Sequence, residues 1–204
     1  MMKGIAAVFV LSICTLAAGP AMASPMTWSF AGSTTGGGLA DIPVGSPVSV
    51  NWTFDPSAPN GCAPGDPTGF YTGQSSTVTI GSTIGPLVYQ SAGILLVDTN
   101  LLLGCVAQGG NSGTVEARLP FWSGPDLPGG PLDTTLVFPG GLFWSQAPGN
   151  GAFPTVQPPF VVLQGPYFNT ASAPHVGVQA NLAAVPVPEP ATAGLLAALA
   201  YVLF

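Results

Sequence analysis

Apolar and polar residues alternate along several short segments, and this alternation constrains the fold of the 204-residue chain more than any other feature. Residues 48–54 read VSVNWTF, with every second residue apolar and Ser, Asn and Thr between them. Successive side chains of a strand point to opposite faces of its sheet, so the pattern predicts an antiparallel strand with one buried face. The same period recurs at residues 26–30, 78–80, 115–121 and 176–182.

Turn-forming residues separate these segments. The chain has 28 Gly and 23 Pro, concentrated in stretches such as DPSAPNGCAPGDPTG, SGPDLPGGP and APGNG. Two continuous apolar stretches, 94–97 and 160–163, predict strands buried on both faces, as at the centre of a sandwich. With no amphipathic helix pattern and no long repeat, residues 24–185 are expected to form one antiparallel all-β domain, a β-sandwich or jelly-roll-like fold.

The N-terminal segment has the layout of a signal peptide. Lys3 precedes an apolar run over residues 5–18, and Ala21-Met22-Ala23 is the small-x-small pattern that signal peptidase cuts. Residues 1–23 are therefore expected to be removed, with Ser24 as the first residue of the mature chain. The run is shorter than the ~20 residues that a membrane anchor needs. The expected partners at this end are the Sec translocon and signal peptidase.

Charge limits the classes of partner. Without the leader, Arg118 is the only basic residue against eight acidic ones, so the formal charge is −7. Nucleic acid is thereby excluded as an expected partner, because phosphate binding needs several Lys or Arg contacts. An anionic membrane surface is disfavoured for the same reason.

Two cysteines, Cys62 and Cys105, remain after removal of the leader. An even pair in an exported domain favours a disulfide, which would stabilise the fold by about 4 kcal/mol in the chain-entropy model. A metal site is the alternative, but neither cysteine belongs to a C-x-x-C pair and His175 is the only histidine.

Candidate catalytic residues are few. His175 would have to serve any nucleophile-base-acid triad, yet its pattern places it on the polar face of a strand over residues 175–182. Asp126 and Asp133 resemble a glycosidase pair, but both flank a PGGP turn, where aspartate commonly caps the backbone. Neither arrangement predicts an enzyme, and no cofactor is expected.

Other polar residues have ordinary structural interpretations. Glu116 and Arg118 share a strand face and predict a surface ion pair of little energetic weight. Four residues offer oxygen ligands suited to Ca²⁺, although none of them lies in an EF-hand spacing: Asp55, Asp66, Asp98 and Asn100.

The C-terminal segment, residues 186–204, resembles the PEP-CTERM sorting signal of exported bacterial proteins. The motif is Pro188, Glu189 and Pro190, followed by an apolar tail expected to be helical. The body segment DIPVGSPVSVNWTFDPSAPNG, with TVTIGS and LLVDTN further on, is similar to the β-rich N-terminal part of many members. The resemblance implies that exosortase, a membrane peptidase, recognises the motif, and that the protein is held transiently in the membrane before it reaches the cell surface or the exopolysaccharide matrix.

The tail departs from the family pattern. Residues 191–204 form a stretch of 14 residues, about 21 Å as a helix against a hydrocarbon core of about 30 Å, and the basic cluster that ends the family's signal is missing. The leading functional hypothesis is still a structural or binding protein of the surface or matrix. A carbohydrate-binding module, with Trp122, Trp144 or Tyr167 stacking on sugars, and a secreted hydrolase are the alternatives.

Overall fold

The computed structural model describes residues 25–62, 69–97, 114–134, 140–145 and 153–186. These residues contain eight strands and no helix: β1 Met26–Gly36, β2 Pro47–Phe54, β3 Gly69–Ile80, β4 Leu87–Val97, β5 Thr114–Ser123, β6 Gly141–Ser145, β7 Phe160–Phe168 and β8 Val176–Ala184. The predicted all-β antiparallel class is confirmed.

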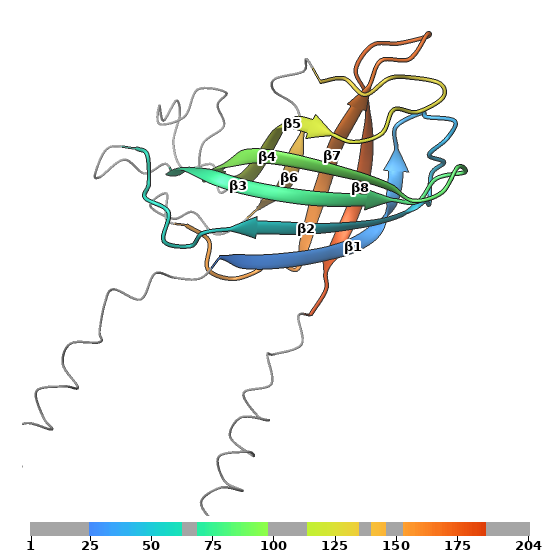
Figure 1. Cartoon of the computed structure of the whole chain (residues 1–204). Coiled ribbons are helices and arrows are strands. Elements are labelled where there is room, and N and C mark those ends of the chain that lie inside the picture. The colour runs from blue at the N-terminus through green and yellow to red at the C-terminus, as the bar shows by residue number, and fades with distance from the viewer. Residues whose placement is uncertain (1–24, 63–68, 98–113, 135–139, 146–152, 187–204) are drawn as a thin grey trace, which may run out of the picture.

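The strands form a single sheet that curls until its two edges meet (Figure 1). Each strand pairs antiparallel with the next along the chain, and β1 also pairs with β8, where Phe30 lies opposite Ala184. The expected sandwich or jelly roll is corrected in this respect, because those folds need chain crossovers between two sheets. Here the turns join neighbouring strands, and closure leaves no unpaired edge.

Alternation in the sequence sets the interior of the barrel. All four apolar residues of the VSVNWTF segment in β2 are buried, and alternate residues of the other strands join them in one core. Aromatic rings fill the end of the barrel where β1 begins. Trp28 packs edge-on against Phe54 at 4.7 Å, and Trp52 lies 5.7 Å from Trp144 of β6. An eight-stranded barrel is just wide enough for such side chains to fill.

The β1–β8 closure depends on a close backbone approach. A Cβ atom at Gly32 of β1 would lie 2.0 Å from the carbonyl oxygen of Asn181 in β8, far inside van der Waals contact. Only glycine fits at this position. We call the pairing of β1 with β8 the seam. Beyond the paired residues, the Val185 amide donates to the Ser29 carbonyl at 2.9 Å, so the seam continues past the last residue of β8.

The topology divides the loops between two ends of the barrel. Strands β2, β4, β6 and β8 finish at the end of the barrel where β1 starts, which we call the terminal end. The loops after β1, β3, β5 and β7 lie at the opposite, distal end. Apolar side chains of these distal loops are buried and close the core there: Leu39, Ile42 and Leu127.

One sequence interpretation is wrong at β7. The apolar stretch 160–163 was expected to be buried on both faces, but Phe160 is 71% exposed and Val162 is 40% exposed. Their neighbours Val161 and Leu163 fill the core. The outer face of β7 is thus apolar and accessible, because the described residues form one sheet and no second sheet among them packs on it.

Candidate functional site

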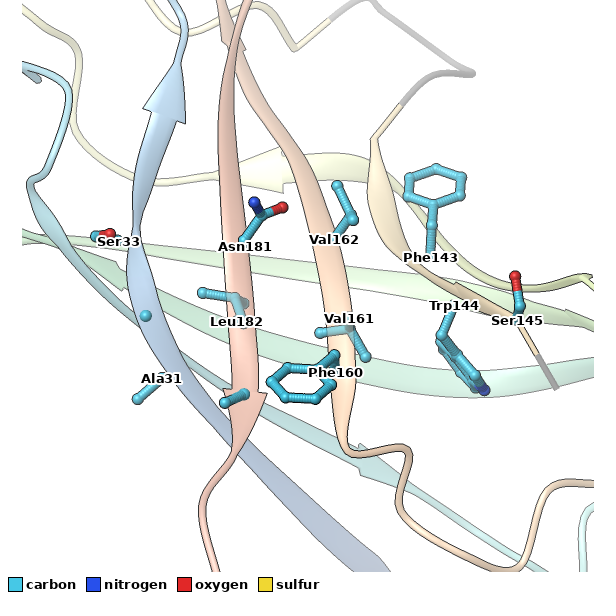
Figure 2. Close-up of a pocket in the computed structure, with 12 residues that line it drawn as sticks. Ala31, Ser33, Phe143, Trp144, Ser145, Phe160, Val161, Val162, Asn181 and Leu182 are labelled. Atoms are coloured by element: carbon cyan, nitrogen blue, oxygen red, sulfur yellow. The ribbon is translucent and has the colours of Figure 1, made fainter.

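An apolar groove runs over the outer face of β1, β8, β7 and β6 (Figure 2). Its volume is about 700 Å³. The outward side chains that line it are mostly apolar, with a few small polar ones among them: Ala31, Ser33, Phe143, Ser145, Phe160, Val162, Asn181 and Ala183. None of the residues that line it is ionisable, so the groove offers contact area for an apolar partner and no acid or base for catalysis.

A second groove of about 590 Å³ lies over the outer face of β2, β3, β4 and β5. We call it the polar groove, because hydroxyl and amide side chains line most of it: Asn51, Thr53, Ser75, Thr77, Gln90 and Ser123. It also contains no charged residue. The alternation that buries Val50, Trp52 and Val78 leaves these polar residues pointing outward.

The distal end brings together two residues that lie 42 positions apart in the sequence. Asp133 follows β5 in a loop whose Leu132 bridges to Phe168 of β7, and its amide donates to the Tyr167 carbonyl at 2.8 Å. His175 lies in the β7–β8 loop, with its amide donating to Asn169 Oδ1 at 3.3 Å. The atoms His175 Nδ1 and Asp133 Oδ2 are 2.5 Å apart.

The environments of these two side chains are unequal. The Asp133 side chain is fully buried, whereas the His175 side chain is 50% exposed. A carboxylate accepts only, so Nδ1–H donates and the bond fixes the ring with Nε2 away from Asp133. His175 also has a φ of 57°, an uncommon conformation for a residue other than glycine. The backbone thus holds the imidazole against a buried carboxylate.

The predictions for these residues need correction. His175 does not lie on the polar face of a strand, because β8 begins at Val176. Asp126 caps the local turn as expected, accepting from the Leu132 amide at 2.8 Å, whereas Asp133 contacts His175 across the distal end. Sequence spacing missed the His175–Asp133 pair, since their loops meet only through the pairing of β5 to β8 and the bridge from Leu132 to Phe168. Within the described residues the imidazole has no hydroxyl or thiol partner, so a nucleophile that would complete a triad is not seen.

Of the three aromatic residues proposed to stack on sugars, two are ruled out by burial. Trp122 and Trp144 are buried in the core, which removes them as sugar platforms. Tyr167 is half-buried, and its ring lies where a Cβ of Gly177 would be. The sequence pattern could not separate these roles, because an aromatic residue beside a Gly- and Pro-rich loop is found both in cores and in binding sites.

Most of the predicted processing residues lie outside the described part of the chain: Ala21, Ala23, Ser24, Pro188, Glu189, Pro190 and Cys105. Cys62 is described and buried, with its amide donating to Asn60 Oδ1 at 2.9 Å. The strands that precede the two cysteines in the sequence, β2 and β4, both finish at the terminal end. The Cys62–Cys105 disulfide stays a prediction.

Of the four candidate calcium ligands, the structure describes only Asp55. Asp55 accepts from both the amide and the hydroxyl of Ser57, and these bonds lower the pKa of its carboxyl. Asp66, Asp98 and Asn100 lie outside the described residues. In the described ranges no three His, Cys, Asp or Glu residues gather as metal ligands would. The side chains of Glu116 and Arg118 are likewise not described.

Two tyrosines have shifted pKa values for reasons of packing. Burial raises the pKa of Tyr89 to about 12, and the charge of Asp126 adds to the shift. Burial also raises the pKa of Tyr71. Both phenols are therefore protonated at neutral pH and do not act as bases there.

No protein-family model matches this sequence, and neither a curated protein nor a solved structure matches it. Among the residues that the structure describes, no helix has the length and apolar character needed to cross a bilayer.

Proposed function

We propose that this chain is an exported structural or binding protein of the cell surface or the exopolysaccharide matrix, sorted by its C-terminal Pro188-Glu189-Pro190 element. The leader over residues 1–23 directs it to the Sec translocon and signal peptidase, and exosortase processes the tail over residues 186–204. The body is the barrel, which the apolar tail holds at the membrane until processing.

The observation that carries the proposal is that β1 begins and β8 finishes at the same end of the barrel. The first residues of β1 and the last residues of β8 lie at the same end, joined by the bond from Val185 to Ser29 (Figure 1). A body attached through either terminus therefore presents its distal end away from the attachment point. This geometry suits a protein that is exported by one end and anchored by the other.

The chemistry of the grooves supports binding rather than a reaction. Both are lined by uncharged residues, and neither contains a paired acid and base. The His175–Asp133 pair is the one arrangement that favours a hydrolase, and the described residues supply it with no nucleophile. A hydrolase would require activity that disappears in His175→Ala.

Replacing Glu189 tests the sorting role. In a host with exosortase, we expect the Glu189→Ala chain to remain unprocessed in the membrane fraction, while the parent reaches the surface or matrix at a smaller mass. Mass spectrometry of the two fractions measures both. The matched control is Asp55→Ala, which removes the same charge from an exposed turn at the terminal end. Equal size and yield of the Glu189→Ala chain in the matrix would overturn the sorting role.

A further inference from the structure

We infer that the polar groove binds an extended neutral polysaccharide. The inference rests on the proposed surface or matrix function and deepens it, because it names the surface of the barrel that holds the glycan. It replaces the stacking hypothesis based on Trp122 and Trp144, whose rings are buried.

Hydrogen-bonding side chains cross the polar groove in one row. Asn51 lies opposite Thr77, Thr77 opposite Gln90, and Gln90 opposite Ser123, on four adjacent strands. Neighbouring strands are about 4.8 Å apart, so the row presents polar groups at a regular interval perpendicular to the strands. An extended polysaccharide presents hydroxyls at a regular interval of similar size along its length. A regular row of donors and acceptors matches such a chain.

Lateral hydrogen bonds hold part of this face in place. The hydroxyls of Thr27 and Thr53 are 2.9 Å apart, and the Ser29 hydroxyl donates to Asn51 Oδ1 at 2.8 Å. The latter bond uses the Asn51 oxygen and directs its amide group, which carries two N–H donors. Side chains that are already ordered lose less entropy on binding.

Charge selects a neutral glycan over an acidic one. The groove has no charged residue, and the chain without its leader carries a formal charge of −7. An acidic polysaccharide would be repelled by the net charge and would find no Lys or Arg among the groove residues. A neutral glycan exchanges its hydrogen bonds with water for hydrogen bonds with Ser, Thr, Asn and Gln at no cost in charge desolvation.

Affinity electrophoresis of the exported chain measures the binding. We expect gels containing hydroxyethyl cellulose or galactomannan to slow the protein, and gels containing alginate to leave its mobility unchanged at both low and high salt. The double variant Thr77→Val/Gln90→Leu removes two polar groups from the row. We expect it to lower the association constant about tenfold, since each hydrogen bond contributes ~0.5–1.5 kcal/mol.

Gln179→Leu is the matched control, because Gln179 is exposed on β8 and does not line the polar groove. We expect this variant to bind like its parent. Absence of retardation by both neutral polymers, retardation by alginate, or equal losses in Gln179→Leu and the double variant would each overturn the inference. The Glu189→Ala chain retains the polar groove, so it should still bind, and failure of sorting is thereby distinguished from failure of binding.

Discussion

The two outer faces of the barrel cover the same core and have opposite chemistry. Over β6, β7, β8 and β1 the outward residues include Phe143, Phe160 and Val162, whereas over β2 to β5 they are chiefly Ser, Thr, Asn and Gln. Beneath both faces the inward residues are mostly apolar and joined in one cluster, with a few buried polar residues among them, such as Ser76 and Ser91. Folding requires only the inward half of the pattern. The outward half is free to vary, so its chemistry indicates what each face contacts.

Exposure to water costs more free energy on the apolar face than on the polar face. Phe160 and Val162 lie side by side on β7 in one groove, so their exposed surface is contiguous. Contiguous apolar surface of this kind commonly marks a contact with another molecule. The polar face needs no cover, and a ligand on it must compete with water for each hydrogen bond. We therefore expect the apolar face to bind a partner strongly by burying apolar surface, and the polar face to bind a ligand more weakly through several hydrogen bonds.

A substitution that separates β1 from β8 should have the largest effect on stability. In Gly32→Ala, the new methyl group meets the Asn181 carbonyl of β8, so β1 and β8 must separate. We expect a loss of about 3 kcal/mol or more in the free energy of unfolding, measured by urea denaturation. Gly36→Ala on the same strand is the control, because its nearest atom is the flexible Gln179 side chain at 3.3 Å. Similar losses in both variants would show that the seam does not depend on Gly32.

Removing the imidazole at the distal end should have an intermediate effect. The His175–Asp133 contact joins the loop that leaves the polar face to a loop of the apolar face. His175→Ala takes this hydrogen bond from a fully buried carboxylate, and we expect a loss of about 1–3 kcal/mol in thermal or chemical denaturation. Ser172→Ala, an exposed change in the same loop, should cost less than about 0.5 kcal/mol. Equal costs would mean that the pair contributes nothing to stability.

Changing the apolar face itself should have the smallest effect on stability. Phe160→Ser removes an exposed ring from the groove, so we expect the free energy of unfolding to change by less than about 0.5 kcal/mol. Binding of the dye ANS, which reports exposed apolar surface, should fall clearly. Val44→Ser is the control, since Val44 is 70% exposed at the distal end and lies outside the groove. If both variants bind ANS like the parent, the groove is not an apolar binding surface.

The alternating pattern predicted much of the fold at particular residues. In β2, Val48, Val50, Trp52 and Phe54 are buried as the period of two requires. The same reasoning was wrong at residues 160–163, where a continuous apolar run has one exposed face. A run without alternation carries no information about which side is covered. That depends on whether another sheet packs there.

The candidate sites were much less predictable. Neither groove has a local motif, because each combines residues from four strands whose register is a property of the sheet. The pair of His175 with Asp133 could be suspected from residue type, but not from spacing. For Trp122 and Trp144, residue type suggested a binding role that the structure excludes, because both candidate sugar platforms are core residues.

The sequence by itself determined the all-β class and, wherever apolar and polar residues alternate, the strands and their inward residues, because the geometry of a strand is local and its period of two is visible in the letters. It also carries the leader-like segment and the Pro188-Glu189-Pro190 element, whose roles stay predictions. Only the tertiary structure decided that the sheet closes on itself, that β1 meets β8 at Gly32, and that Asp133 reaches His175. Closure joins the first and last strands, β1 and β8, and contacts at such separation depend on the twist and register of every strand between them.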